Sequence, residues 1–335
     1  MKDRKKRNAL IALSFFSLTA VVIAPFIGME TISISSLIHP IKGSMDSEIF
    51  WRIRIPRIGA SFLAGAALAI SGMVFQSMFH NPLATPFTLG VSSGAAFGAA
   101  LFIKIGIIFS LFGVFGQTIG AFLGALVSIF IVYGLSRLKK GFSISTMLLA
   151  GVAVNFFFSS LILFLQYISD FNRSYQIIRW LMGGFEIAGY SPVIKILPFT
   201  ILGSLVVFFY ISELNLLVLG EDIALSRGVE VKKVKTVLFF AVSLMIAGVI
   251  SVIGPIGFVG MMVPHIVRLL IGEDHRYLSF GSFIFGGAFL VFCDTIARTL
   301  IAPSEIPVGV ITAFLGGPFF IWLLMLGDGD KSLFH

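Results

Sequence analysis

The stretch RIPRIGASFLAGAALAISG, residues 54–72, places two arginines and a proline directly before an almost uncharged apolar run. The whole chain of 335 residues is likewise apolar, because 57% of its residues are hydrophobic and only 12% are charged. Apolar runs of about 20 residues are long enough to cross a bilayer as helices. Without alternation of period two, such runs favour helices over a barrel. The sequence therefore predicts an all-α, polytopic membrane protein.

Ten apolar segments predict about ten transmembrane helices in a single domain that covers residues 1–335. The first is interpreted as a retained span, because its apolar part is longer than that of a signal peptide. Two connections are long enough to hold structure, an outer one at about 29–57 and an inner one at about 212–235. The predicted helices lie at about 8–28, 58–79, 87–103, 107–135, 142–168, 193–211, 236–253, 256–271, 277–300 and 306–327.

The basic residues predict how the chain is oriented. The net charge is +8, but its 24 lysines and arginines are scattered between apolar runs, which favours membrane orientation over nucleic-acid binding. Most of them fall on one side when both termini are placed in the cytoplasm of a bacterial cell. Arg52, Arg54 and Arg57 fall on the outer side, where the orientation rule does not explain them.

Few residues suggest chemistry of their own. The phosphate-binding sequence G-x-x-x-x-G-K-[ST] is absent, so we expect no ATP hydrolysis by that route. Cys293 and His265 are isolated in apolar surroundings and do not indicate a metal site. Asp294 lies inside a predicted span with Arg298 four residues on, a spacing that favours a structural ion pair over proton or sodium coupling.

Small residues recur on two predicted helices at intervals that let helix backbones approach closely. We expect these faces to pack within one subunit rather than between subunits. They comprise Gly65, Ala69 and Gly72 in the second span, and Gly116, Gly120 and Gly124 in the fourth.

The inner connection contains LGEDIALSRGVEVKKVK, residues 219–235, in which acids, small residues, glycines and bases alternate. A solvated loop needs no such arrangement. Two short helices with a glycine joint would need it, and they could occupy a groove on a cytoplasmic partner.

Several stretches together resemble the permease family of ATP-binding-cassette (ABC) importers for iron–siderophores, haem and vitamin B12. They occur in the order typical of the family and span nearly the whole chain. One departure is Arg227, where the family more often has leucine. The stretches are RIPR (54–57), AGAALAISGMVFQSMFHNPLATPFTLGVSSGAAFG (64–98), LLAGVAVN (148–155), LGEDIALSRGV (219–229), GPIGFVGMMVPHIVRLLIGEDHR (254–276) and EIPVGVITAFLGGPFFIWLL (305–324).

This resemblance implies a type II ABC importer permease fold of ten helices and a second permease subunit, either the same chain or a paralogue. It also implies two ATPase subunits that bind ATP and Mg²⁺, an extracytoplasmic binding protein, and no cofactor in this chain. The translocation path would be lined by the fifth and tenth helices, at about 142–168 and 306–327.

The resemblance further assigns three groups of residues to interfaces and to the path. The binding protein would dock on Arg54, Arg57 and Arg298. The ATPase would couple through Gly220, Glu221, Ala224 and Gly228. The cytoplasmic gate would consist of Asn81, Pro82, Leu83 and Ser145.

The function implied is import of an iron(III)–siderophore complex across the cytoplasmic membrane, by a permease that is not itself an enzyme. Haem and vitamin B12 are alternative cargoes within the same family. An ion-coupled secondary carrier is a more distant alternative, and transport by this chain without an ATPase would distinguish it.

Overall fold

The computed structural model describes residues 2–30, 32, 45–106, 110–111, 114–138, 144–185 and 189–326. Each of the ten predicted segments corresponds to a helix, which confirms the predicted fold class. These helices are α1 (Lys2–Ile23), α4 (Ile55–Phe79), α5 (Val91–Ile105), α6 (Gly116–Leu138), α7 (Ile144–Tyr167), α9 (Ser191–Phe209), α12 (Val231–Ile253), α13 (Val259–Ile271), α14 (His275–Thr299) and α15 (Val308–Leu326).

Short elements connect the long helices. Strands β1 (Ser110–Leu111) and β2 (Val114–Phe115) pair antiparallel, so the helix predicted over about 107–135 begins only at Gly116. The other short elements are the 3-10 helix η1 (Ala24–Phe26), α3 (Met45–Glu48), the π-helix η2 (Ile49–Arg54), α8 (Phe171–Leu181), α10 (Ile211–Val218) and α11 (Glu221–Ser226).

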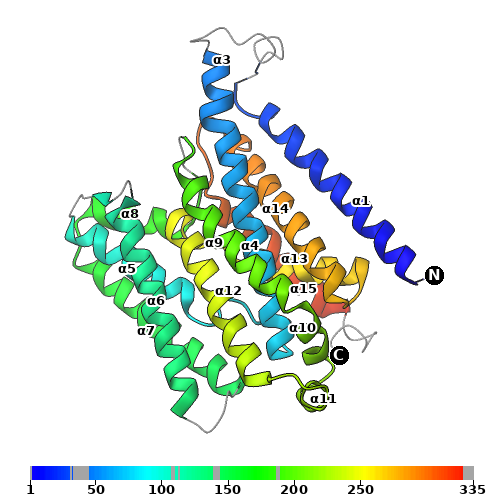
Figure 1. The fold of residues 1–335 in the computed structure, drawn as a ribbon. Coiled ribbons are helices and arrows are strands. Elements are labelled where there is room, and N and C mark those ends of the chain that lie inside the picture. The colour runs from blue at the N-terminus through cyan, green and yellow to red at the C-terminus, as the bar shows by residue number, and fades with distance from the viewer. Residues whose placement is uncertain are drawn as a thin grey trace.

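Helix α4 lies at the centre of the bundle and is buried along most of its length. It packs against α9, α12, α13 and α14, and α1 lies on the outer side of α14 (Figure 1). Helices α5 to α8 form a second group, which joins the first mainly through α12. The bundle therefore has two unequal groups of helices that share α12.

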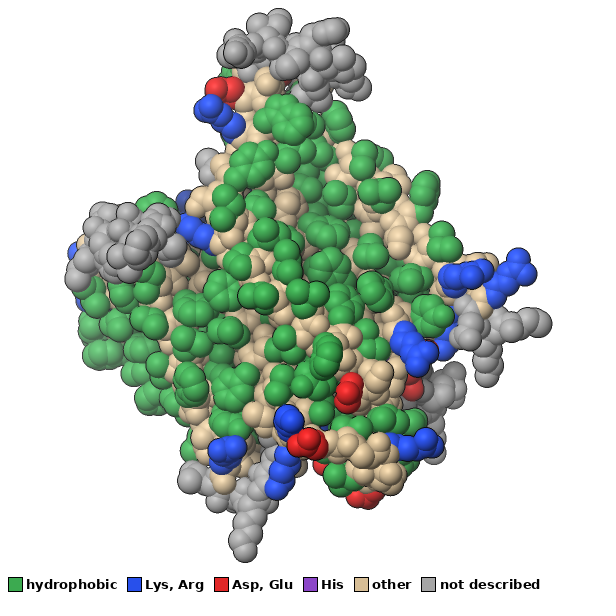
Figure 2. Space-filling model, viewed as in Figure 1, with side chains coloured by type: hydrophobic (Ala, Val, Ile, Leu, Met, Phe, Trp, Pro, Cys, Tyr) green, Lys and Arg blue, Asp and Glu red, His purple; other side chains and the backbone are tan. Residues whose placement is uncertain are grey.

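The length and polarity of the helices suit a membrane. Among the described residues, seven helical segments are long and apolar enough to span one, and α5, α13 and α15 contribute shorter apolar helices. Hydrophobic side chains cover the middle of the face in Figure 2, while charged side chains gather toward its edges. This distribution is expected where lipid surrounds the middle of a bundle and water its ends.

Glycines set the closest helix contacts, as their spacing predicts. A Cβ on Gly72 would lie 1.6 Å from the carbonyl oxygen of Gly260 on α13. A Cβ on Gly124 would lie 2.1 Å from the carbonyl oxygen of Gly94 on α5. The small-residue faces of α4 and α6 therefore pack against helices of the same chain, which confirms the prediction.

The outer connection differs from the prediction of a loop over 29–57. A continuous helical segment starts at Met45 and runs to Phe79, so Arg52 and Arg54 lie on helix rather than in a loop. Pro56 lies where the π-helix η2 passes into α4, and the helical segment continues through it. The remainder of this connection, residues 31 and 33–44, lies outside the described residues.

Helix α8 was not predicted from the sequence. Its N-terminus is capped by Asp170, whose carboxylate accepts the backbone N–H of Arg173 at 2.9 Å. This hydrogen bond lowers the pKa of Asp170 below its ordinary value. The cap and the burial of Ile177 hold a short amphipathic helix across the end of the second helix group.

Candidate functional site

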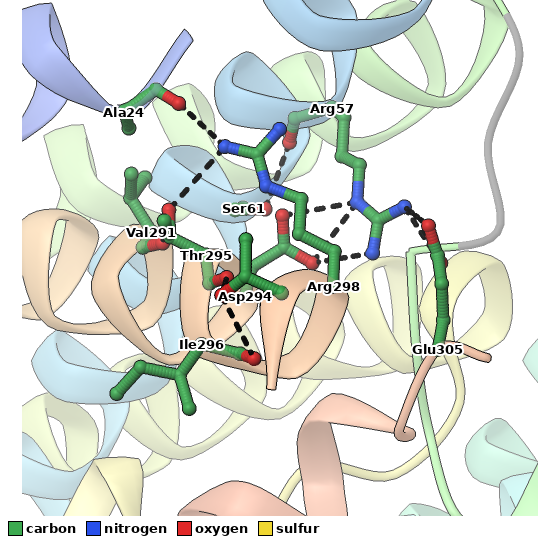
Figure 3. Close-up of polar contacts among 10 residues, drawn as sticks. Ala24, Arg57, Ser61, Val291, Asp294, Thr295, Ile296, Arg298 and Glu305 are labelled. Atoms are coloured by element: carbon green, nitrogen blue, oxygen red, sulfur yellow. Dashed lines mark hydrogen bonds and ion pairs between the residues drawn. The ribbon is translucent and has the colours of Figure 1, made fainter. Parts of the chain in front are cut away.

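One end of the bundle, here called the arginine end, is organised by Arg57 of α4. Its guanidinium lies between two carboxylates, with an ion pair of 2.9 Å to Asp294 of α14 and one of 2.8 Å to Glu305 (Figure 3). Asp294 is buried, whereas the side chain of Glu305 is 43% exposed. The arrangement thus joins α4, α14 and the turn before α15 through one cation.

Arg54 and Arg298 lie at the same end and bind backbone carbonyls. Arg298 donates to the carbonyl of Ala24 at 2.6 Å (Figure 3). Arg54 donates to the carbonyl of Pro25 at 2.8 Å. Carbonyls at a helix C-terminus carry partial negative charge, so cations stabilise them. The two guanidinium groups therefore hold the end of α1 and η1 against the bundle.

These contacts correct one prediction and bear on another. Asp294 pairs with Arg57 rather than with Arg298, because Arg298 turns toward the carbonyls of η1. Arg54, Arg57 and Arg298 are 4%, 6% and 8% exposed, so all three side chains are buried within the chain. Their predicted role in docking a binding protein stays a prediction.

At the opposite end, here called the coupling end, the inner connection contains two short helices, of which α11 lies in the stretch 219–235 where the pair was predicted and α10 lies just before it. Gly220 joins them with a φ of 125°, and Gly228 follows α11 with a φ of 82°. Both φ values lie in a backbone region that glycine adopts readily and that residues with a side chain rarely adopt. A Cβ on either glycine would meet open space, so the backbone conformation explains why glycine occupies both positions.

Two contacts hold α11 in place. Ala224 is fully buried, and its carbonyl accepts the backbone N–H of Val229 at 3.0 Å. Glu221 forms an ion pair with Lys235 of α12, a lysine that is only 1% exposed. Three of the four predicted coupling residues therefore determine the conformation of α11 and its flanking turns. The fourth, Glu221, binds α11 to α12 through the ion pair with Lys235.

A groove of about 460 Å³ lies beside this segment. Its charged lining mixes both signs, which suits a protein partner with complementary charges. The lining includes Glu213, Arg227, Glu230 and Lys233.

The predicted gate residues lie in two places. Asn81, Pro82 and Leu83 follow α4, which ends at His80 in a left-handed conformation, and the Asn81 side chain accepts the backbone N–H of Leu83 at 2.9 Å. This shaped turn agrees with the conformation predicted from Pro82. Leu83 is 53% exposed, and Ser145 is exposed in the first turn of α7. Their role as a gate stays a prediction.

Sequence reasoning missed a polar groove beside α8. Two adjoining hollows of about 360 and 570 Å³ share Ile103, Gln117 and Gln176. The α8 groove, as we call it, also contains Asn172, Arg173 and Arg179. The capping residue Asp170 and the helical spacing of Ile177 and Leu181 were signals that could have revealed the helix.

The ten long apolar helices of the described residues, with an exposed pair of short helices at one end, form the architecture of a multi-pass membrane protein. The chain belongs to the FecCD transport family, whose model matches residues 13–326. It is therefore the permease subunit of an ABC importer and associates with a permease partner and with ATPase subunits, which hydrolyse the ATP.

Several relatives are similar over nearly their full length. The hemin transport system permease protein HmuU of Yersinia pestis is 38% identical, with 96% of this chain and 97% of that protein covered. The vitamin B12 import system permease protein BtuC of Salmonella typhi is 35% identical, with 97% of each covered. The iron(3+)-hydroxamate import system permease protein FhuG of Bacillus subtilis is 32% identical, covering 97% of this chain and 99% of that protein.

A solved structure has the same fold. It is described as an inward-facing conformation of a metal-chelate type ABC transporter, and it superposes with a TM-score of 0.85. The identity is 31%, and the match covers 95% of this chain and 99% of the solved one.

Proposed function

We propose that this chain is the permease subunit of an importer for an iron(III)–siderophore complex. The FhuG relative is named for iron(3+)-hydroxamate import, and the solved relative for a metal chelate. We further propose that the importer lies in a bacterial cytoplasmic membrane with both termini inside, as the distribution of basic residues favours.

The observation that carries the choice of cargo is the polarity of the α8 groove. Gln117, Asn172 and Gln176 bring amide groups to it, and Arg173 and Arg179 bring guanidinium groups. An iron–siderophore complex exposes ligand and backbone oxygens that accept hydrogen bonds from such donors. Weak contacts of this kind suit a path that must release its cargo.

The partners follow from the two ends of the bundle. We propose that the binding protein docks at the arginine end through Arg54, Arg57 and Arg298, and that the ATPase docks on α10 and α11. ATP and Mg²⁺ belong to the ATPase subunits, and we propose no cofactor for the permease. The second permease is either another copy of this chain or a paralogue, and lipid surrounds the apolar faces.

Haem is the second candidate cargo, because the HmuU relative is named for hemin and is 38% identical. Vitamin B12 is a third, because the BtuC relative is named for it. Haem presents a flat apolar ring with carboxylates at one edge. It would therefore use the arginines of the α8 groove more than its amides.

Uptake by cells that lack this chain tests the cargo. Such cells should lose entry of radioiron supplied as an iron(III)–hydroxamate complex and should keep entry of haem and cobalamin. Returning the wild-type chain should restore the loss. Loss of haem or cobalamin entry alone would contradict the proposed cargo while leaving the permease assignment intact.

A further inference from the structure

A row of three hydrogen-bonded side chains, two of them buried, joins α10 to the central helices. Asn215 lies in the middle of α10, and its side-chain oxygen accepts the backbone N–H of His275 at 2.9 Å. The same oxygen lies 3.0 Å from Nδ1 of His275, at the start of α14. On the far side of the ring, Nε2 lies 2.6 Å from the hydroxyl oxygen of Ser77 on α4. Three helices thus meet through three side chains.

The hydrogen-bond partners determine which atom donates and which accepts at each of these contacts. The Asn215 amide is oriented by its two ends, because its oxygen accepts a backbone N–H and its nitrogen donates to Asp274 at 3.3 Å. A carbonyl oxygen only accepts, so Nδ1 of the neutral His275 ring carries the hydrogen and Nε2 accepts from Ser77. The Ser77 hydroxyl also lies 2.8 Å from the carbonyl of Met73, so two acceptors compete for one hydrogen.

Because two of the three side chains are buried, breaking these hydrogen bonds is costly in free energy. His275 is 2% exposed and Ser77 is 4% exposed. A buried polar group that loses its partner bears the full cost of desolvation, so displacement of one member is felt by the next. The hydrogen bonds among Asn215, His275 and Ser77 therefore couple the position of α10 to that of α4.

A second contact strengthens this connection near the predicted gate. Nε2 of His80 lies 3.0 Å from the carbonyl oxygen of Leu217, in the last turn of α10. His80 caps the C-terminus of α4, and Asn81 to Leu83 follow it directly. Helix α10 is thus bound to the end of α4 at two points, through His275 and through His80.

We propose that Asn215, His275 and Ser77 form a relay that transmits movement of α10 to the end of α4 and the segment after it. This inference rests on the proposed docking of the ATPase on α10 and α11. The three residues are positioning residues, since their contacts lie within the chain. A purely structural role would lower the amount of folded permease without changing how much cargo enters for each ATP hydrolysed.

The chain offers a matched control on α4. Ser71 is buried like Ser77, and its hydroxyl donates to the carbonyl four residues earlier, that of Ala67, at 2.6 Å. Ser77 makes the same type of contact with Met73 but also reaches His275. Ser71→Ala and Ser77→Ala therefore remove the same atom from the same helix, and only the second interrupts the relay.

The measurement is the number of cargo molecules imported per ATP hydrolysed. The permease, its ATPase and its binding protein are placed in proteoliposomes and supplied with an iron(III)–hydroxamate complex, haem or cobalamin. Ser77→Ala and Asn215→Leu should each lower this ratio about fivefold or more, a typical size for coupling between sites. Ser71→Ala should leave it unchanged. Asn215 lies on a partly exposed helix, so Asn215→Leu provides the test even if Ser77→Ala does not fold.

The double variant makes the test more specific. Because both substitutions interrupt one relay, the Ser77→Ala/Asn215→Leu permease should have a ratio no lower than the worse single variant. Unchanged ratios in the single variants, or losses that multiply in the double variant, would overturn the relay and leave the proposed function standing. A wild-type complex without ATP-dependent import would overturn the proposed function and the relay with it.

Discussion

Arg57 and Asp294 lie 237 residues apart in the sequence and form an ion pair of 2.9 Å between α4 and α14. Asp294 is 1% exposed, and Arg57 is 6% exposed. Removing one member of a buried pair leaves an uncompensated charge in surroundings of low polarity. The contact therefore stabilises the arginine end of the bundle.

The first prediction compares the two carboxylates that bind Arg57. Asp294→Asn should lower the free energy of unfolding by at most about 3–5 kcal/mol, the cost of breaking a buried pair, because Glu305 still pairs with Arg57. Glu305→Gln should cost only about 0–1 kcal/mol, because the Glu305 side chain is 43% exposed. Thermal and denaturant unfolding of both variants in detergent measures the difference. Equal losses would contradict the assignment of Asp294 as the principal partner.

The second prediction concerns docking at the arginine end. Glu305→Gln removes an exposed negative charge beside Arg57 and keeps the Asp294 pair. If acidic groups of a binding protein dock here, association should become faster at low salt, and the gain should shrink as salt is added. Glu273→Gln, at the coupling end, is the control and should leave the association rate unchanged. An unchanged rate for Glu305→Gln at low salt would count against docking at this end.

The third prediction concerns Gly228, which has a φ of 82°. Gly228→Val places a β-branched side chain in a region that costs of order 1–3 kcal/mol, so we expect the segment after α11 to rearrange. The permease should still reach the membrane but lose cargo uptake and retain less ATPase on purification. Gly228→Asn should keep most of both, because asparagine tolerates left-handed backbone. Normal uptake by Gly228→Val would remove the support for coupling through this segment.

The fourth prediction concerns Leu83, which is 53% exposed. Leu83→Ala should change stability by no more than about 0.5 kcal/mol, because surface substitutions are usually mild. If Leu83 narrows the exit, the variant should nevertheless hydrolyse more ATP for each cargo molecule imported. Leu89→Ala, at a site 1% exposed, should instead lower stability by about 2–5 kcal/mol. Unaltered ATP use by Leu83→Ala would argue against a gate at this position.

The ten long helices could be predicted from the sequence because their apolar runs carry the signal locally. Two helices could not. Residues 45–54 combine charged groups with Trp51, and residues 171–181 are amphipathic, so neither segment resembles a buried span. Both segments lie near the end of a group of helices and are partly exposed, so polar and apolar side chains are mixed in their sequences.

The polar contacts were harder to predict than the helices. The spacing of Asp294 and Arg298 predicted a local ion pair, but Arg57 reaches the carboxylate from another helix. Asn215, Ser77 and His275 lie far apart in the sequence, with no spacing that links them. Only the packing of α4, α10 and α14 brings them together, and such packing cannot be read from one helix at a time.

The proposed importer is tested most directly by radioiron entry into proteoliposomes that contain this permease, its ATPase and its binding protein. The iron is supplied outside as an iron(III)–hydroxamate complex, with ATP or a non-hydrolysable analogue on the ATPase side. The account predicts entry with ATP and none with the analogue or without the ATPase. Iron entry driven by an ion gradient through the permease alone, or ATP-driven entry of haem or cobalamin but not of the hydroxamate complex, would contradict it.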